Sequence, residues 1–355
     1  MARHTTPSKS IHLNQIKKKI KDDTVRWGIL GVGDVCEVKS APAMQKVEYS
    51  EVVAVMRRNG AKAKDYAERH QIDTWYDNAD ALINDPKVNA IYIATPPNAH
   101  LNLTIKAAKA GKPVYVEKPM ARTRAECQQM IDACAAAQVP LYIAYYRRKL
   151  PNFEKLKTLL AARVIGDLRM VKIEMYKTLD PDLLSNIVTT MPINWRVDPE
   201  VSGGGYFYDL AAHQLDFLDH ALGPISSVSG FASNQVGAYT AADIVSASFE
   251  FKSGVVGSGI WCFTANAISE KEEVTFIGSK GQIHLSFFGA PKLYVERTGV
   301  AMEVFEFEIP KHIQQPLIQT IVDDLLGKGV CPSTGTTAIR TNWVMEEITK
   351  NYYAK

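Results

Sequence analysis

Apolar residues in the first part of the chain fall in short continuous runs, and stretches with helical spacing separate them. The apolar runs are Val25–Leu30, Val52–Met56, Asn89–Ala94, Val114–Val116 and Val139–Ala144. The helical stretches include Ala61–His70, His100–Ala110 and Thr123–Gln138. Continuous apolar strands that alternate with helices are typical of a parallel sheet covered on both faces. The pattern therefore predicts a doubly wound α/β domain over residues 24–147.

After Pro151 the pattern changes to short segments in which apolar and polar residues alternate. The predicted strands are Arg169–Lys177, Val228–Val236, Asp243–Phe251, Val255–Thr264, Val274–Ile277, Ile283–Leu285 and Val304–Ile309. Tight turns between such strands favour an antiparallel sheet. One helix is predicted from about Gly205 to Leu222, with Ser202 as its cap. We expect an α+β domain over residues 148–312, followed by helices in 313–355 that pack back on the first domain.

Composition excludes several classes of protein. The chain has 355 residues, 46% hydrophobic and 22% charged, with a net charge of +3, which leaves room for about two globular domains and argues against a nucleic-acid partner. The five cysteines are scattered without C-x-x-C spacing, so a reducing compartment fits better than a disulfide framework or a zinc ribbon. Because there is no membrane-length apolar run and no apolar signal region, we expect a cytoplasmic protein with a basic surface extension at residues 1–23.

A glycine cluster follows the first predicted strand directly. Gly31 and Gly33 match the first two positions of a G-x-G-x-x-G loop, and Cys36 replaces the third glycine. Such a loop lets the backbone approach a pyrophosphate, and the helix that opens at Asp34 and Val35 presents its positive end to it. An ordinary turn between strand and helix is the alternative. The parallel-sheet context favours the dinucleotide interpretation.

The second predicted strand ends in Met56-Arg57-Arg58-Asn59. An acidic residue at this place would accept a hydrogen bond from the ribose 2′-hydroxyl of NAD, whereas an arginine accommodates the 2′-phosphate of NADP. Arg57 stands where the acid would be, and a guanidinium binds phosphate through paired hydrogen bonds. The sequence therefore favours NADP, with NAD as the possible substitute. The alternative is that Arg57 and Arg58 only solvate a strand end.

Two further motifs carry groups suited to proton transfer. Lys118 follows the strand Val114–Val116, at the edge where ligands of open α/β sheets bind. Asp209 and His213 are four residues apart on the predicted helix, so their side chains can meet. A histidine or lysine oriented by a carboxylate can give or take a proton in carbonyl reduction or alcohol oxidation. A metal site that includes Asp216 is the weaker alternative, because no cysteine or second histidine is suitably placed.

These motifs in this order resemble the Gfo/Idh/MocA oxidoreductases, the family of glucose–fructose oxidoreductase and inositol dehydrogenases. The resemblance is carried by GILGVGDV, IATPPNAH (Ile93–His100), VEKPM (Val116–Met120) and WRVDPEVSGGGYFYDLAAHQLD (Trp195–Asp216). It implies a Rossmann domain followed by a domain with a large open-faced antiparallel sheet. In the family that sheet often makes oligomer contacts, so a homodimer or homotetramer is expected.

The resemblance also assigns roles to residues. Lys118, Asp209 and His213 match the catalytic group, with Lys118 polarising the substrate oxygen; whether Lys118 or His213 carries the proton stays open. Cofactor contacts are expected at Gly31, Gly33, Thr95, Pro96, Asn98, His100, Glu117 and Lys118, and at the pair Trp195-Arg196. Substrate contacts are expected in the run Tyr146-Arg147-Arg148, above all at Tyr146 and Arg148, and at the three catalytic residues.

The predicted function is an NADP-preferring oxidoreductase that transfers a hydride between nicotinamide and a sugar, a sugar derivative or a cyclic polyol. Two alternatives remain within the same superfamily: a dinucleotide-binding regulator without activity, and an NAD-using glycosidase. The intact Lys–Asp–His set argues against the regulator, and Arg57 disfavours the glycosidase.

Overall fold

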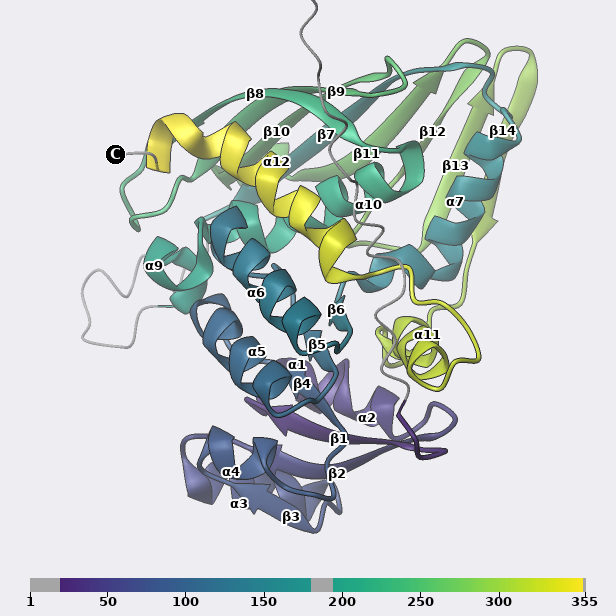
Figure 1. Ribbon diagram of the computed structural model, residues 1–355. Coiled ribbons are helices and arrows are strands. Elements are labelled where there is room, and N and C mark those ends of the chain that lie inside the picture. Colours follow the sequence, from purple (N-terminus) through teal and green to yellow (C-terminus); the bar gives the residue numbers. More distant parts are fainter. Residues whose placement is uncertain (1–19, 180–193, 354–355) are drawn as a thin grey trace, which may run out of the picture.

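The computed structural model describes residues 20–179 and 194–353, which build two sheets with helices around and between them (Figure 1). The first sheet is wholly parallel, with the strand order β3-β2-β1-β4-β5-β6. Its strands are β1 (Val25–Leu30), β2 (Ser50–Met56), β3 (Thr74–Tyr76), β4 (Ala90–Ile93), β5 (Val114–Val116) and β6 (Leu141–Ile143). Its helices are α1 (Asp34–Val38), α2 (Ala41–Met44), α3 (Gly60–Arg69), α4 (Ala79–Ile83), η1 (Pro97–Ala99), α5 (His100–Lys109) and α6 (Arg124–Ala136).

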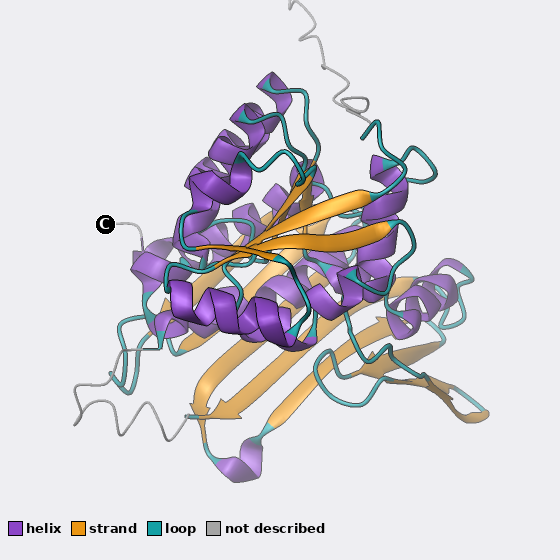
Figure 2. Cartoon of the chain, turned by 90° about the horizontal axis from the view of Figure 1, so that it is seen from below, coloured by secondary structure: helices purple, strands orange, loops and turns teal. Residues whose placement is uncertain are grey.

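The first sheet is buried on both faces, which confirms the meaning of its continuous apolar runs. Every residue of β4 and β5 is buried, and helices lie on either side of the strands (Figure 2). Polar caps fix where these helices begin: the Asn59 side chain accepts from the Lys62 N–H, and Thr123 accepts from Glu126. The strand order reverses between β1 and β4, and open α/β sheets bind ligands at such a point.

The second sheet has eight strands in the order β14-β13-β12-β11-β7-β10-β9-β8. The strands are β7 (Leu168–Thr178), β8 (Ile225–Ser233), β9 (Ile244–Phe251), β10 (Val256–Ala265), β11 (Lys271–Gly278), β12 (Gly281–Leu285), β13 (Lys292–Arg297) and β14 (Val300–Glu306). Buried and exposed residues alternate strictly along β9 from Val245 to Phe251. The sheet therefore packs one face on the core, as the alternating pattern predicts, and exposes the other.

The remaining helical segments all follow β6 in the chain, and several of them form the region that connects the two sheets (Figure 1). They are η2 (Tyr146–Lys149), α7 (Pro151–Ala161), η3 (Trp195–Val197), α9 (Pro199–Ser202), η4 (Phe207–Ala211), α10 (Ala212–Leu222), η5 (Ala267–Ser269), α11 (Gln315–Leu325) and α12 (Gly335–Tyr353). None of the helices in the described ranges is long and apolar enough to cross a membrane. All five cysteines are free thiols.

The second sheet departs from the sequence prediction in two ways. β7 and β10 pair in parallel, whereas every other neighbouring pair is antiparallel. The strand β13 (Lys292–Arg297) was not among the predicted strands. Pairing between strands distant in sequence is decided by the path of the connection, which local alternation does not report.

The helix expected over Gly205–Leu222 is not regular. Its first part, η4, is a π-helical turn, and only α10 is an ordinary α-helix. Ser202 ends α9 and its hydroxyl accepts a hydrogen bond from the Gly205 N–H at 2.9 Å, which fixes the entry into η4. The wider turn changes which side chains of this segment share a face.

Both C-terminal helices contact the first domain, and the second of them also contacts the second domain. α11 packs against α2 and η2, whereas α12 packs against β8 and α10 of the second domain as well as α6 of the first. α12 thus joins the two domains. Most of the basic extension at residues 1–23 lies outside the described residues; its Asp22 forms an ion pair with Arg26 at 2.7 Å.

Candidate active site

A cleft of about 1700 Å³ lies at the carboxyl ends of the first sheet's strands. Its walls come from the loops after β1, β2, β4 and β5, and from η2, η3, η4 and α10 of the connecting region. Sites for one small molecule usually enclose about 300–1,000 Å³. The volume is therefore consistent with a cleft that takes two reactants side by side.

The glycine loop forms one part of this cleft. Gly31 has φ +93°, and a Cβ there would lie 2.7 Å from the Thr95 side chain, so a larger residue does not fit. A Cβ on Gly33 would meet no atom within 4 Å, and α1 begins after it without a side-chain cap. The Thr95 hydroxyl is buried and has no hydrogen-bond partner among the described residues. This open, polar, uncapped cradle fits the diphosphate of a dinucleotide.

The structure brings nearly all predicted cofactor residues to the cleft wall. They are Gly31, Gly33, Asp34, Val35, Arg57, Arg58, Thr95, Pro96, Asn98, Glu117, Lys118, Trp195 and Arg196. His100 is the exception and corrects the prediction. Its ring is fully buried, with Nε2 2.8 Å from the Thr95 carbonyl and Nδ1 3.1 Å from the Met120 carbonyl. His100 therefore ties two cleft loops together instead of contacting a ligand.

Glu117 is fixed by a network that includes a residue missed by the sequence analysis. Its Oε1 accepts from the Tyr92 hydroxyl at 2.7 Å and from Gln314 Nε2 at 2.6 Å. Gln314 lies directly before α11 and also lines the cleft. In turn, the Tyr115 hydroxyl donates to Gln314 Oε1 at 2.8 Å. A segment from the far end of the chain therefore orients the carboxylate beside Lys118.

Lys118 and Asp209 form the polar centre of the cleft. Lys118 Nζ donates to the Asp209 carbonyl at 2.9 Å and to its Oδ1, and Arg196 Nε lies 3.5 Å from Oδ2. The Arg196 guanidinium also lies 4.5 Å from the centre of the Trp195 ring. Burial tends to raise the pKa of Asp209, but Lys118 and Arg196 outweigh it and lower that pKa. The carboxylate is thus held ionised between two cations.

His213 lies in the first turn of α10 and lines the same cleft, 3% exposed. The rings of Tyr146 and Phe288 face it edge-on, with centroids at 5.1 and 5.9 Å. Its Nδ1 is buried, and no group in residues 20–179 or 194–353 forms a hydrogen bond with it. Burial, followed by the charges of Arg147, Lys118 and Lys39, lowers the pKa of His213 well below its usual value. The imidazole is therefore neutral at neutral pH.

The expected contact between Asp209 and His213 does not form. Both carboxylate oxygens of Asp209 are engaged by Lys118 and Arg196. Asp209 lies in the π-helical turn η4, and this wider turn removes the four-residue stacking on which the prediction rested. Lys118, Asp209 and His213 nevertheless line one cleft. Phe288, which the sequence analysis did not single out, completes the wall beside His213.

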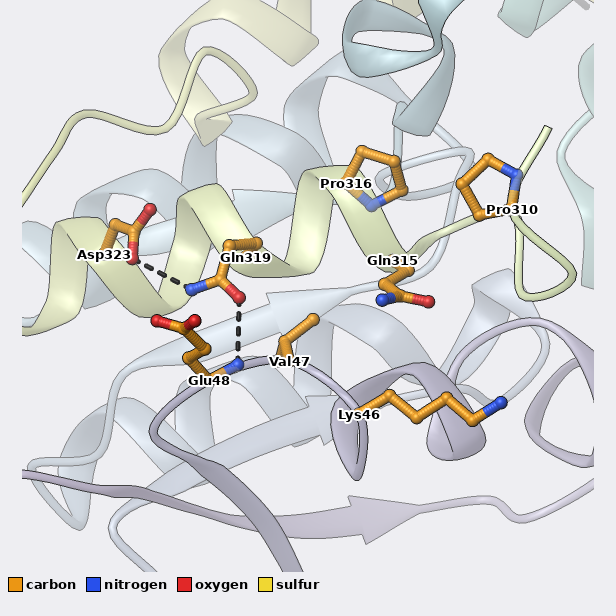
Figure 3. A pocket seen from close by; sticks show the side chains of 8 residues that line it. All are labelled: Lys46, Val47, Glu48, Pro310, Gln315, Pro316, Gln319 and Asp323. Atoms are coloured by element: carbon orange, nitrogen blue, oxygen red, sulfur yellow. Dashed lines mark hydrogen bonds between the residues drawn. The ribbon is translucent and has the colours of Figure 1, made fainter. Parts of the chain in front are cut away.

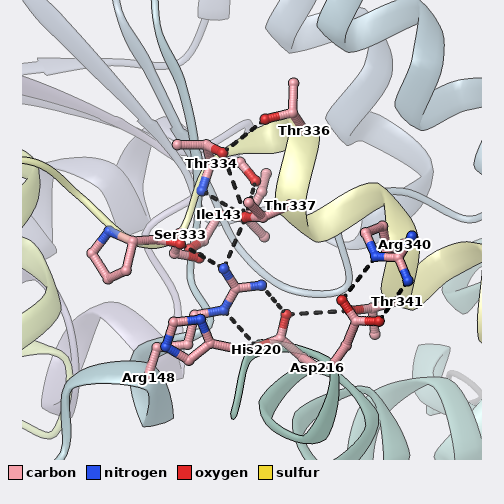
Figure 4. A network of polar contacts seen from close by, with 12 residues as sticks. Ile143, Arg148, Asp216, His220, Ser333, Thr334, Thr336, Thr337, Arg340 and Thr341 are labelled. Atoms are coloured by element: carbon pink, nitrogen blue, oxygen red, sulfur yellow. Dashed lines mark hydrogen bonds and ion pairs between the residues drawn. The ribbon is translucent and has the colours of Figure 1, made fainter. Parts of the chain in front are cut away.

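Arg148 is also a correction, since it does not reach the cleft. Its side chain is 2% exposed and pairs with Asp216, and Nη1 donates to the Pro332 carbonyl at 2.6 Å and to Thr337 Oγ1 at 2.8 Å (Figure 4). Asp216 is 1% exposed, so the same pair removes it as a metal ligand. In the two described stretches of chain, no three His, Cys, Asp or Glu side chains could hold a metal ion.

A second, smaller hollow of about 500 Å³ lies between α11 and the segment after α2 (Figure 3). Its lining residues are Lys46, Val47, Glu48, Pro310, Gln315, Pro316, Gln319 and Asp323. None of these is a predicted site residue. The large cleft at the sheet edge is therefore the candidate active site.

Comparison with known proteins agrees with this geometry. Residues 25–145 match the model of the oxidoreductase family with an NAD-binding Rossmann fold, and residues 153–284 match the Gfo/Idh/MocA C-terminal domain. The chain is 39% identical over 327 residues to Oxidoreductase P35 of Formosa agariphila, covering 92% of this chain and 98% of that relative.

Solved structures share the fold at lower identity. A levoglucosan dehydrogenase in complex with NADH and levoglucosan superposes with a TM-score of 0.81 at 20% identity, covering 92% of this chain and 96% of its own. A 3-ketoreductase from Actinomadura kijaniata in complex with NADP and TDP-benzene gives 0.79 at 18% identity, covering 92% and 97%. The two family matches together span most of the chain, and the protein therefore belongs to the Gfo/Idh/MocA family of oxidoreductases.

Proposed function

We propose that the protein is an NADP-preferring oxidoreductase that transfers a hydride between nicotinamide and a sugar, a sugar derivative or a cyclic polyol. The observation that carries this proposal is the convergence of Lys118, Asp209 and His213 on a cleft whose other wall is a glycine loop that fits a diphosphate. A protein that only binds a dinucleotide has no need of this arrangement.

Lys118 is placed to hold the reacting oxygen of the substrate. An ammonium group has three donors, and two of them go to Asp209, so one remains for a ligand. Its charge stabilises the alkoxide that develops when an alcohol loses its proton. Asp209 holds Lys118 in place and is itself held by Arg196. The pair therefore acts as a fixed clamp on the substrate oxygen.

His213 is suited to exchange the proton. As a neutral imidazole it can accept the hydroxyl proton during oxidation and return it during reduction. The bound dinucleotide supplies the hydride acceptor or donor. The walls of the cleft bring both reactants together, which contributes much of the rate of such reactions.

Arg57 and Arg58 support a preference for NADP. Both line the cleft at the end of β2, and neither pairs with a carboxylate in the part of the chain that the structure describes. Basic side chains outnumber acidic ones along the cleft wall, which suits a cofactor with several phosphates. The similar solved structures hold NADH in one case and NADP in another, so the preference rests on the arginines.

The aromatic wall supports a cyclic substrate. Tyr146, Trp195 and Phe288 line the cleft near the polar centre, and such rings pack against the apolar face of a sugar or cyclic polyol. The levoglucosan in the complex named above is consistent with this class.

The free thiols of all five cysteines support a cytoplasmic location.

An assembly of two or four chains through the second sheet is part of the proposal. Phe231, Val256 and Ile260 on β8 and β10 are 68%, 50% and 42% exposed, respectively. Phe231 and Ile260 both pair with Ser246 of β9, so they share the outer face. Exposed apolar side chains on one sheet face are typical of an interface between copies.

The cofactor preference is tested by titrating the protein with NADPH and with NADH while following nicotinamide fluorescence. We expect NADPH to bind at least tenfold more tightly, about 1.4 kcal/mol, and Arg57→Asp to abolish the difference. Arg163→Asp, a change at an exposed arginine of the second domain, is the matched control. Equal or tighter binding of NADH by the unmodified protein would contradict the NADP assignment.

The reaction class is tested by NADPH oxidation with a panel of ketoses and osones. Turnover should be lost in Lys118→Ala and His213→Ala variants that still bind the cofactor. If both variants kept full turnover, the assignment of these residues to catalysis would be wrong.

A further inference from the structure

Arg147 is a buried cation. It is 4% exposed, and no carboxylate within the described ranges forms an ion pair with it. Its Nε and Nη2 donate to the Phe287 carbonyl at 3.0 and 2.8 Å, and Nη1 donates to the Tyr146 hydroxyl at 3.0 Å. Buried charges are normally paired because an unpaired one is costly. The adjacent Arg148, which pairs with Asp216, follows that rule, and Arg147 does not.

The same two aromatic rings lie beside Arg147 and beside His213. The Arg147 guanidinium carbon is 4.4 Å from the centre of the Phe288 ring and 5.1 Å from that of Tyr146. These rings in turn face the imidazole of His213 edge-on. Cation–π attraction of this kind holds ring and guanidinium in a fixed relation. Arg147 and His213 therefore both contact the rings of Tyr146 and Phe288.

We propose that Arg147 is a positioning residue that keeps His213 in its neutral form and fixes the Tyr146–Phe288 wall of the substrate site. The inference rests on the proposed function, because it gives His213 its use as the proton acceptor in alcohol oxidation. In this proposal Arg147 does not contact the reactants, and its charge affects the reaction only through His213.

The surroundings of His213 single out Arg147 among the nearby charges. Lys118 approaches from the loop after β5 and is paired with Asp209, while Lys39 lies on the exposed end of α1. The ring of Tyr145, directly before η2, and that of Tyr146, in η2, lie edge-on to the imidazole. Asp209 and Asp216, on the same helical segment as His213, are held by Lys118 and by Arg148.

Of Arg147, Lys118 and Lys39, only Arg147 is both buried and without a carboxylate partner in the described part of the chain. Its field is screened least by water or by a counter-charge. The pKa of His213 is lowered first by burial and next by Arg147, which agrees with this geometry. Removing the charge at position 147 should therefore make His213 easier to protonate.

The test is the titration of His213 by NMR of histidine-labelled protein, with the signal identified in a His213→Gln variant. In the unmodified protein the titration midpoint of His213 should lie well below pH 6.5. Arg147→Gln keeps a donor for the Phe287 carbonyl and removes the charge, and should raise the titration midpoint of His213 by at least one pH unit. Arg147→Lys keeps the charge and should leave the midpoint within a few tenths of a unit.

Arg163→Gln, at an exposed arginine, is the matched control and should change nothing. The proposal is overturned if Arg147→Gln folds and leaves the midpoint unchanged, or if Arg147→Gln and Arg147→Lys raise it equally. Should Arg147→Gln not fold, a His213 midpoint at or above pH 6.5 in the unmodified protein overturns it as well.

Activity separates this inference from the proposed function. The acidic limb of the pH profile of kcat/KM for alcohol oxidation should move to higher pH in Arg147→Gln and not in Arg147→Lys. Full turnover in His213→Gln would remove the catalytic role of the histidine and leave the NMR result standing. If Arg147→Gln leaves the His213 midpoint unchanged while His213→Gln loses activity as expected, only the role proposed for Arg147 would be wrong.

Discussion

Two ion pairs involve carboxylates about two helical turns apart on the segment that runs from η4 into α10, and the pairs differ in solvent exposure and in unused hydrogen-bond donors. Lys118 and Asp209 have side chains 13% and 20% exposed and face the cleft, whereas Arg148 and Asp216 are 2% and 1% exposed. Burial raises the pKa of Asp216 against the pull of Arg148, while the neighbouring cations lower the pKa of Asp209.

The two pairs also differ in how many hydrogen-bond donors of the cation already have partners. Arg148 donates to Asp216, to the Pro332 carbonyl and to Thr337, and the Thr341 hydroxyl completes the shell of Asp216 (Figure 4). Lys118 uses two of its three N–H donors for Asp209, and the third is left for a ligand. Of two similar pairs, the one with unused hydrogen-bonding capacity on a cleft wall is the better candidate for chemistry.

Breaking the buried pair should have the largest effect on stability. Arg148→Met leaves the Asp216 carboxylate buried without its cation, which typically costs about 3–5 kcal/mol. The measurement is urea-induced unfolding followed by tryptophan fluorescence, with Arg163→Met as an exposed control expected to change stability by less than about 0.5 kcal/mol. A loss below about 1 kcal/mol in Arg148→Met would mean that the two pairs do not differ as argued.

Breaking the cleft pair should instead reduce activity. Lys118→Ala removes the donor that we propose for the substrate oxygen, so kcat should fall by about 10²–10³, equivalent to 2.7–4 kcal/mol. Its unfolding free energy should change by less than about 1 kcal/mol, because the pair is partly hydrated. A Lys118→Ala variant as unstable as Arg148→Met would assign both pairs to the scaffold.

The neutral state of His213 should appear as a pH dependence of stability. Because the pKa of His213 is lower in the folded protein than in the unfolded chain, only the unfolded chain binds this proton below about pH 6.5. Stability contributed by His213 is therefore present above that pH and is lost as the pH falls, by about 1.4 kcal/mol per pH unit.

His213→Gln should lack this part of the slope. The pKa values of His100 and His220 are also lowered, chiefly by burial, but both residues remain in the variant, so the difference between the two proteins isolates His213. The measurement is the urea midpoint between pH 5 and 7.5. Identical slopes would show that His213 titrates normally in the folded state.

Much of the fold could be read from the sequence because its elements are locally determined. The buried strands of the first sheet are unbroken apolar runs, and caps such as Asn59 and Thr123 mark helix starts. The parallel pairing of β7 with β10 could not be read, because it depends on the route of the chain through η4 and α10. β3 (Thr74–Tyr76) has only three residues and carries too short a pattern.

The sequence prediction agrees with the cleft lining wherever a motif places a side chain directly at a strand end, as at Lys118 and Arg57. The prediction was wrong where contacts with distant parts of the chain decide where a side chain lies. Arg148 and His100 belong to the right motifs, but Asp216 and the Thr95 and Met120 carbonyls hold them away from the cleft. Phe288 and Gln314 were missed because no local pattern distinguishes them, and only folding brings them to the cleft.

The position of α12 has a consequence for biosynthesis. Arg148 is made early, yet its partners at Pro332, Thr337 and Thr341 leave the ribosome only after nearly all the other described elements. Until they emerge, the Arg148–Asp216 pair lacks part of its hydrogen-bonded shell and β8 lacks the helix that covers it. Because α12 contacts both domains, a nascent chain stalled before residue 335 would have a complete glycine loop in its first domain, while its second domain would still lack the helix that packs on β8.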